Sequence, residues 1–204
     1  MNEYFHNQKG AIRHVNYYFL ESQLPKSGFV DGSVAFLPDL ETYYSQIRTR
    51  LPIDTVAEVL LHSSIRKLKN DYFHTTDGAK VISDAFKILL ERQKTDLQFI
   101  PAALRYHNGR PVERAYWIAH LPNEVDCLDY ERSDYGRKAV IAASVHEPPR
   151  KLIKVLFKAY LDTEKVGGRE FFMLAHVLAL KPIISEEFYL VCKKNKLNLN
   201  VTPL

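Results

Sequence analysis

The sequence lacks the segments by which proteins enter or cross membranes. No stretch approaches the ~18 consecutive apolar residues of a membrane-spanning helix. The opening residues, MNEYFHNQKGAIRH, contain no apolar core behind a basic start, so we expect no secretory signal. The sequence therefore predicts a protein that stays in the cytoplasm and has no membrane partner.

Cysteine is also scarce, since only Cys127 and Cys192 occur among 204 residues. Two cysteines in a chain without a signal are more often free thiols than a disulfide. Cys192 falls on the apolar stripe of an expected helix, so we predict a small buried hydrophobic residue there. Cys127 lies between Asp126 and Asp129, and acidic neighbours raise the pKa of a thiol, which makes it a poor nucleophile.

Motifs for metal, nucleotide or acyl chemistry are missing too. The eight histidines form no HExxH, CxxC or CxxH spacing, and no GxxxxGK[ST], GxGxxG or GxSxG occurs. We therefore predict no metal, no cofactor and no catalytic residues. The net charge of +4 is mild and no basic cluster reaches the roughly 5–8 residues of a nucleic-acid patch, so nucleic acid is not the expected partner.

The most informative feature present is a stretch that occurs twice. Residues 81–102 read VISDAFKILLERQKTDLQFIPA, and residues 183–204 read IISEEFYLVCKKNKLNLNVTPL. The two align without a gap. Six residues recur, Ile82, Ser83, Phe86, Lys94, Leu97 and Pro101, as Ile184, Ser185, Phe188, Lys196, Leu199 and Pro203.

Each copy predicts the end of a strand, a helix and a second strand. The serine is suited to cap a helix, because its hydroxyl accepts a hydrogen bond from a free N–H of the first turn. An acidic residue follows, which suits the positive end of the helix dipole. Apolar residues then recur at helical spacing and later at a period of two. We expect Phe86 and Phe188 in the core of one structural repeat, with units 81–102 and 183–204.

The remaining chain predicts an α+β fold with a mixed, mainly antiparallel sheet and about three helices, in a single domain over 1–204. Strands are expected at 11–20, 29–37, 104–120, 138–146 and 151–161, the third as a hairpin with a type I′ turn at Asn108-Gly109. Residues 170–180 are expected to pair with 151–161, with a buried helix as the alternative. Residues 54–69 fit a helix or a strand, 38–53 a loop with one helical turn, and 70–78 a polar turn.

An acidic turn, residues 124–134, is the strongest local charge feature, with Glu124, Asp126, Asp129, Glu131 and Asp134 opposed by Arg132. Its spacing does not fit a calcium loop. One interpretation is an exposed turn that Asp126 and Asp129 cap. The other is a docking surface for a basic partner, because charge selects partners and tyrosines anchor interfaces. Its contacting residues would be Asp129, Tyr130, Glu131, Asp134 and Tyr135.

Two pieces of the chain resemble the immunity proteins of bacterial polymorphic-toxin and contact-dependent or type VI secretion systems. The first is YWIAHLPNEVDCLDYERSDY, with its tyrosine-rich strand, Val-Asp-x-Leu-Asp run and Glu-x-Ser. The second is the β-pair, Ser-acid, helical Phe pattern that ends in LQFIP or LNVTP. The resemblance covers residues 71–135 and 172–204. It departs from the family pattern at Cys127, where a small residue is usual, and after the last helix, where Asn195 and Asn198 replace an expected glycine.

The resemblance implies a binding protein and not an enzyme. Its partner would be a cognate toxin domain, neutralised by blocking of the toxin's active site or of substrate access. A cytoplasmic inhibitor suits a toxin that acts on nucleic acid, nucleotides or proteins. Two alternatives stay open from the residues: a nucleic-acid-associated module, and a small enzyme whose site combines scattered residues such as His120, Cys127 and Glu131.

Overall fold

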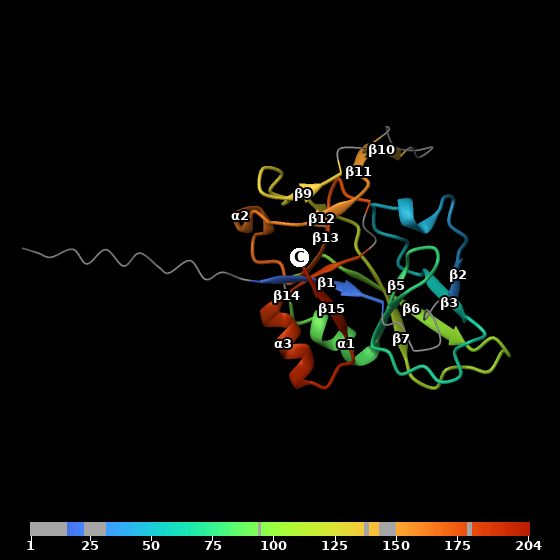
Figure 1. The fold of residues 1–204 in the computed structure, drawn as a ribbon. Helices are drawn as coiled ribbons and strands as arrows, with labels where there is room; N and C mark the ends of the chain where they lie inside the picture. Colours follow the sequence, from blue (N-terminus) through green and yellow to red (C-terminus); the bar gives the residue numbers. More distant parts are fainter. Residues whose placement is uncertain (1–15, 23–31, 94, 137–138, 143–149, 179–180) are drawn as a thin grey trace, which may run out of the picture.

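The computed structural model describes residues 16–22, 32–93, 95–136, 139–142, 150–178 and 181–204 (Figure 1). Two larger sheets and two strand pairs make up its strands. The six-stranded sheet has the order β2 (Gly32–Leu37), β3 (Val56–Leu61), β6 (Gln98–Arg105), β7 (Tyr116–His120), β5 (Lys80–Ser83) and β4 (Tyr72–His74). The five-stranded sheet has the order β15 (Asn200–Pro203), β1 (Tyr17–Glu21), β14 (Ile183–Ser185), β13 (Phe171–Leu174) and β8 (Glu124–Val125).

The shorter elements complete the described chain. β10 (Ala139–Ala142) pairs with β11 (Arg150–Ile153), and β9 (Asp134–Tyr135) pairs with β12 (Leu156–Lys158). The helices are α1 (Asp84–Leu90), α2 (Thr163–Val166) and α3 (Glu186–Lys194), with a 3-10 turn η1 (Tyr44–Gln46). In the described part of the chain, strand pairing is antiparallel apart from β3–β6 and β13–β8. The expected α+β class, with three helices and a mixed, mainly antiparallel arrangement, is confirmed.

The internal repeat is also present. β5, α1 and β6 form the first unit, and β14, α3 and β15 form the second. Ser83 and Ser185 occupy the N-cap positions with nearly equal backbone angles, φ −71° in both and ψ 159° and 154°. Each hydroxyl accepts a hydrogen bond from the phenylalanine N–H three residues later, at 3.3 Å from Phe86 and 3.1 Å from Phe188. The capping predicted from sequence is therefore confirmed in both copies.

The structural repeat extends beyond the two aligned stretches. Each cap serine also donates its hydroxyl to a buried or half-buried carboxylate immediately before the neighbouring strand β4 or β13, Ser83 to Asp71 at 2.6 Å and Ser185 to Glu170. β4 and β13 thus occupy equivalent places beside β5 and β14. On the other side, β7 pairs with β5 and β1 pairs with β14.

β1 is the equivalent of β7 in detail, although it comes from the beginning of the chain. Trp117 of β7 donates its indole N–H to Asp84 at 2.9 Å, and Tyr18 of β1 donates its hydroxyl to Glu186 at 3.1 Å. Trp117 also faces Pro101 in the strand register, as Tyr18 faces Pro203. The second unit is therefore completed by a strand that does not follow it in sequence.

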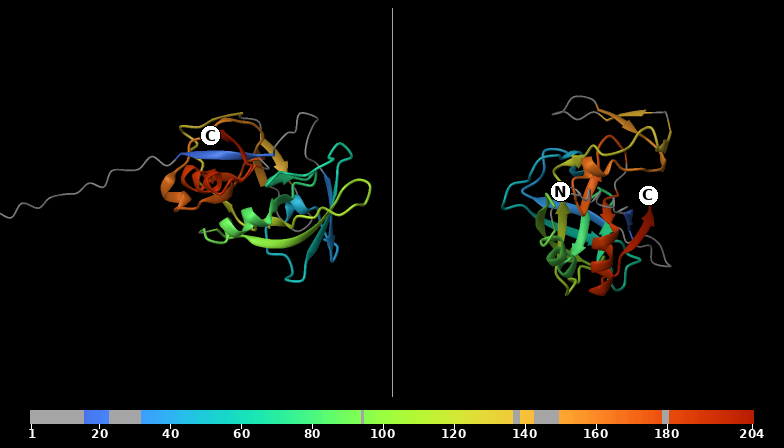
Figure 2. Two further views of the ribbon diagram at one scale, coloured as in Figure 1. Left: turned by 90° about the horizontal axis from the view of Figure 1, so that it is seen from below. Right: turned by 90° about the vertical axis from the view of Figure 1, so that its left-hand side faces the viewer.

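The two units meet through their helices, which lie side by side in Figure 1 and in the right-hand view of Figure 2. The rings of Phe86 and Phe188 are stacked, with centroids 6.2 Å apart and planes at 25°. Phe171 contacts Phe86 edge-on at 6.1 Å. The cluster around these rings draws buried side chains from both sheets, including Ile82 and Ile184. This shared cluster favours the single domain expected over 1–204, which stays a prediction.

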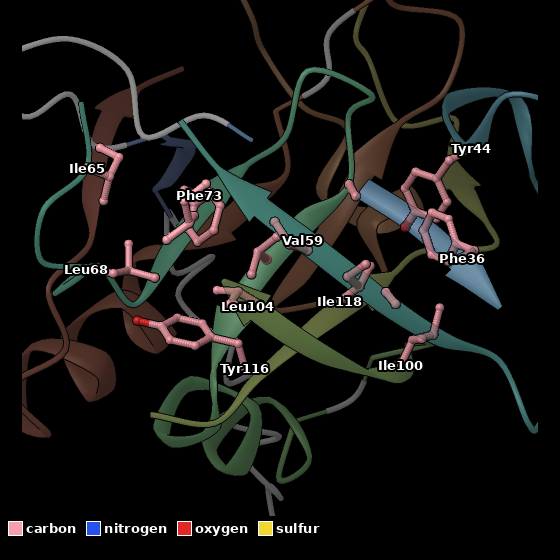
Figure 3. Close-up of a cluster of buried hydrophobic side chains, with 14 of the residues drawn as sticks. Phe36, Tyr44, Val59, Ile65, Leu68, Phe73, Ile100, Leu104, Tyr116 and Ile118 are labelled. Carbon is pink, nitrogen blue, oxygen red and sulfur yellow. The ribbon is translucent and has the colours of Figure 1, made fainter. Parts of the chain in front are cut away.

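Alternation along the strands separates three buried clusters. On β6, Phe99 packs with the cluster around Phe86, whereas Ile100 and Leu104 pack on the opposite face of the sheet (Figure 3). On β14, Ile184 joins the cluster around Phe86, whereas Ile183 joins a third cluster. The cluster around Phe86 and Phe188 therefore lies between the two sheets, and the other two clusters cover their outer faces.

Of the two alternatives for residues 54–69, the strand is present, since β3 has the alternating burial of a half-buried strand. Other local predictions were wrong because tertiary pairing decided them. The polar turn expected at 70–78 contains β4. The hairpin at Asn108-Gly109 is present, but only the glycine has a positive φ, 82°, whereas a type I′ turn needs two such residues. Tyr106 and Arg110 close a three-residue loop instead, with Tyr106 N–H donating to Arg110 at 2.9 Å.

The hairpin expected between 170–180 and 151–161 is not formed, and neither is a buried helix. β13 pairs with β14 and, in parallel, with β8, and the two segments meet at an isolated parallel bridge between Ile153 and Val177. The segment 151–161 itself contains parts of β11 and the whole of β12. After α3, the residue with a left-handed backbone is Lys196, φ 59°, and not an asparagine. Its N–H donates to Lys193 and the N–H of Leu197 donates to Cys192, which is the pattern of a Schellman helix end.

The stretch 11–20, expected as a strand, contains most of β1. Residues 11–15 of this stretch lie outside the described residues. β2 and β10 likewise lie within the stretches 29–37 and 138–146, whose remaining residues at 29–31, 138 and 143–146 are outside the described residues. The loop at 38–53 contains one helical turn, η1, as expected.

We predict that Phe86→Ala and Phe188→Ala each lower the free energy of unfolding by about 3–5 kcal/mol, because each removes a buried aromatic ring. Since the two rings are in contact, the double variant should lose less than the sum of the single losses. Denaturant unfolding of the four proteins measures this.

Ile88→Ala and Leu190→Ala are matched controls on the same helices, because their side chains are 42% and 55% exposed. They should change the stability by less than about 1 kcal/mol. Equal losses in the controls and in the phenylalanine variants would show that the stacked pair does not join the two units.

Candidate functional site

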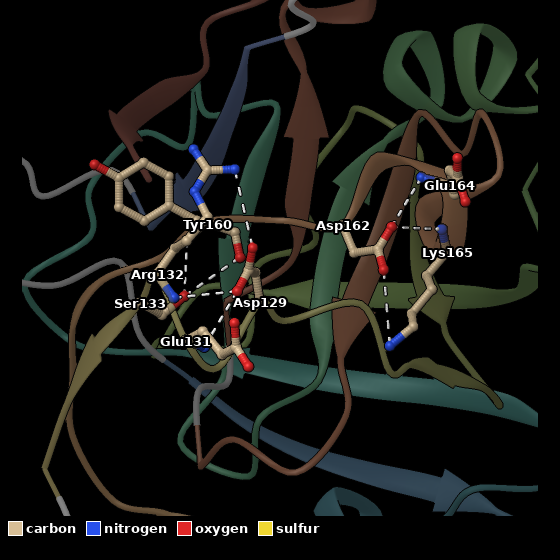
Figure 4. A network of polar contacts seen from close by, with 8 residues as sticks. All are labelled: Asp129, Glu131, Arg132, Ser133, Tyr160, Asp162, Glu164 and Lys165. Carbon is tan, nitrogen blue, oxygen red and sulfur yellow. Dashed lines mark hydrogen bonds and ion pairs between the residues drawn. The ribbon is translucent and has the colours of Figure 1, made fainter.

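The acidic turn, residues 124–134, is ordered by Asp129 (Figure 4). The Asp129 carboxylate accepts hydrogen bonds from the backbone N–H groups of Glu131 and Arg132, both at 3.1 Å. Its own N–H donates to the Tyr160 carbonyl at 2.9 Å, and its carbonyl accepts from the Ser133 N–H at 3.0 Å. Asp129 therefore holds the backbone of the turn, as the capping interpretation expected.

Tyr160 fixes the turn from the neighbouring segment. The Ser133 hydroxyl accepts a hydrogen bond from the Tyr160 N–H at 2.9 Å and donates to its carbonyl at 3.3 Å. The Arg132 guanidinium and the Lys158 ammonium lie 4.6 and 4.8 Å from the centre of the Tyr160 ring. Because backbone and side-chain contacts act together, the turn presents a preformed surface.

The five candidate residues form two neighbouring groups. Tyr130 and Tyr135 contact each other edge-on, with ring centroids 6.0 Å apart, and Tyr130 is 40% exposed. Glu131 and Asp134 are exposed. The turn therefore displays two carboxylates and an aromatic pair. Oδ1 of Asp129 accepts the two backbone hydrogen bonds, and its Oδ2 lies 3.9 Å from the Arg132 guanidinium.

The other two acidic residues of the turn, Glu124 and Asp126, make different contacts. Glu124 pairs with Arg48 at 2.7 Å, and its side chain is only 13% exposed, so it does not contribute to an acidic surface. Asp126 accepts a hydrogen bond from the Tyr130 hydroxyl at 3.5 Å and lies 4.0 Å from His176. Burial and the nearby Asp126 carboxylate raise the pKa of Tyr130, which keeps its hydroxyl a donor.

The structure does not bring the residues of the enzyme alternative together by any described contact. His120 is buried and bonds to the Tyr44 hydroxyl at 3.2 Å and to the Thr49 carbonyl at 2.7 Å. Burial lowers the pKa of His120, which favours a neutral structural imidazole. Cys127 lies in the third buried cluster, and burial, followed by the Asp126 charge, raises the pKa of its thiol to about 12. Glu131 is exposed on the turn.

Both cysteines are free and buried, which confirms that neither forms a disulfide and that Cys192 is buried. Cys192 lies in the cluster between the sheets, as does Leu90, the residue with which it aligns in the repeat. Among the described residues, no three His, Cys, Asp or Glu side chains come together in a way that would hold a metal ion. In the same part of the chain, no helix is long and apolar enough to cross a membrane.

Sequence reasoning missed a groove beside the acidic turn, whose lining includes Lys154 and residues 156–159 together with residues of β1 and β15. The alternation in 151–161 places Phe157 on the apolar face of the expected strand. In the structure the Phe157 side chain is 69% exposed. The apolar alternation at 151–161 is visible in the sequence. Alternation alone, however, does not show whether other residues cover the apolar face of a strand.

The family model of the Imm11 immunity proteins matches residues 6–199. The chain belongs to the Imm11 immunity protein family. The match includes residues 6–70, which carry none of the resemblance described above. No curated protein matches the chain significantly.

Membership in the Imm11 family confirms the immunity-protein resemblance and gives the chain a role in protection against a toxin. The match also covers β1, β2 and β3, which lie outside residues 71–135 and 172–204. In the fold, β1 completes the second repeat unit, so the additional residues belong to the same architecture.

One buried charge gives the fold a pH dependence. Lys80 is only 9% exposed, and burial lowers the pKa of its amine from 10.5 to about 8, with Arg48 acting in the same direction and Glu124 opposing it. Between pH 8 and 10.5 the unfolded chain binds more protons at this residue than the folded protein does, so its contribution to stability rises with pH. Below pH 8 Lys80 is charged in the folded protein, and burial of this charge lowers the stability by its full amount.

We predict that the stability of the wild type, measured relative to Lys80→Met, rises by about 3 kcal/mol or less between pH 7 and 10.5. Lys67→Met, at an exposed lysine, is the control and should show no such change. Denaturant unfolding at several pH values measures both differences. A constant difference for Lys80→Met would mean that the amine titrates as it does in water.

Proposed function

We propose that this Imm11 protein binds a cognate antibacterial toxin and neutralises it by blocking the toxin's active site or the access of its substrate. Membership in the immunity family over residues 6–199 is the observation that carries this proposal. The protein acts by binding and not by catalysis. Its partner is a toxin domain delivered by a type VI or another polymorphic-toxin secretion system, and the two meet in the cytoplasm.

The acidic turn supplies the docking surface in this proposal. Its backbone is already held by Asp129, Ser133 and Tyr160, so binding requires little additional ordering. The exposed carboxylates of Glu131 and Asp134 attract a basic partner and select it. Tyr130 and Tyr135 supply the apolar contact, since aromatic side chains commonly anchor interfaces.

The exposed carboxylates of the acidic turn suit a toxin that acts on phosphate-containing substrates. Such an enzyme needs a cationic site, and carboxylates on a preformed turn stand in for the substrate's charge. Asp129 contributes mainly by shaping the turn, because its carboxylate is engaged by two backbone N–H groups. Removing Asp129 would therefore alter the surface through its backbone, whereas Glu131 and Asp134 act through their charge.

We predict that Glu131→Lys combined with Asp134→Lys lowers the association rate with the toxin on the order of tenfold at low ionic strength, because charge steering is reversed. The probe is the C-terminal domain of a large secreted protein encoded beside this gene, with its own catalytic residue inactivated. Stopped-flow association at several salt concentrations measures the rate and its salt dependence.

Glu113→Lys is the matched control, since Glu113 is exposed in the connection between β6 and β7 and lies outside the acidic turn. It should leave the rate nearly unchanged. Circular dichroism and unfolding show that each variant remains folded. An unchanged rate and salt dependence in the double variant would leave the turn as a purely structural feature.

A further inference from the structure

The groove that borders the acidic turn has a volume of about 510 Å³. Its lining comes from β1, from the C-terminal residues 202–204, and from His74 of β4, with further residues at 154, 156–159, 177–178 and 181. Phe19 and Leu204 lie at its base and also pack against the third buried cluster. The base is therefore held by the core, and the groove does not depend on a ligand for its shape.

Apolar side chains line the groove without being buried in it. Phe157 is 69% exposed and Leu178 is 49% exposed. Neither side chain belongs to one of the three buried clusters. Adjacent exposed apolar side chains at a concave site mark a surface that binds another molecule. The Phe157 ring is large enough to bury a substantial apolar area when a partner covers it.

The charge in the groove is mainly positive. Lys154, Lys158 and Lys181 line it together with His74 and one acidic side chain, Glu21. Glu21 is already engaged, because it accepts hydrogen bonds from Lys181 at 2.7 Å and from the Thr202 hydroxyl at 2.9 Å. Lys154 and Lys158 are exposed, so their charge is available to a partner. The complementary molecule is one that combines carboxylates with an apolar side chain.

The groove and the acidic turn share one strand pair. Lys158 and Leu156 of β12, which line the groove, face Asp134 and Tyr135 of β9, which belong to the docking surface proposed above. Figure 1 shows β9 and β12 lying together. A partner seated on the acidic turn therefore reaches the groove without leaving this part of the surface.

We propose that the groove receives an extended segment of the toxin in which an apolar side chain is flanked by carboxylates. The apolar side chain packs on Phe157 and Leu178, and the carboxylates meet Lys154 and Lys158. This inference rests on the toxin-binding function proposed above and adds a second contact region of opposite charge. A nucleic acid fits less well, because its phosphates would meet the Glu21 carboxylate and the apolar base.

The test uses the full chain and the inactivated toxin domain from the adjacent gene, with binding followed by calorimetry. Phe157→Ala and Lys154→Glu change exposed side chains, so they should leave the fold intact. We expect Phe157→Ala to raise the Kd about tenfold or more, as loss of an aromatic anchor does. Lys154→Glu should raise the Kd as well, and its effect should shrink as the salt concentration rises.

Tyr43→Ala and Lys67→Glu are the controls, since Tyr43 is an exposed aromatic residue and Lys67 an exposed lysine outside the groove. Both should bind as the wild type does. If the wild type binds the toxin and both groove variants bind equally well, the groove inference is wrong and the proposed function stands. If the wild type does not bind the toxin, both the groove inference and the proposed function are wrong. Binding of a single-stranded DNA oligonucleotide that is lost in the groove variants would also overturn the inference.

Discussion

The stacking of Phe86 on Phe188 is the contact on which both halves of the fold depend. Each ring lies in the first turn of a short helix. Each helix is fixed by a serine cap that is itself hydrogen-bonded to a carboxylate immediately before β4 or β13. The two rings meet in the cluster that lies between the two sheets. A helix of seven residues such as α1 is too short to be stable alone, so it is the tertiary contact that holds it in place.

Polar contacts around Asp71 support this packing. Asp71 accepts from Ser83 and from Arg114, and its second oxygen accepts from the Asn198 N–H at 2.7 Å, which leads into β15. One buried carboxylate therefore joins the first repeat unit to the second. A buried charge is tolerated only where such partners surround it, since an unpaired one would be costly. The repeat is thus held by a hydrogen-bonded frame as well as by apolar packing.

The surface proposed for toxin binding is built on the opposite face of the five-stranded sheet, over the third cluster. There the acidic turn and the basic groove meet along β9 and β12. Surfaces of opposite sign next to each other constrain the orientation of a partner more than a single charge patch does, because a rotated partner brings like charges together. Aromatic side chains at each part, Tyr130 with Tyr135 and Phe157, then supply the apolar area.

The sequence by itself determined the local features: the two serine caps, the burial of Phe86 and Phe188, the burial of Cys192 and the strand after each helix. These depend on neighbours within a few residues or on a period, and a sequence carries both directly. Only the tertiary structure decided that β1 completes the second unit, that 56–61 is a strand, that Glu124 turns inward to Arg48 and that Phe157 stays exposed. Each of these depends on a partner far away in the chain, and the same local pattern fits a covered and an uncovered face equally well.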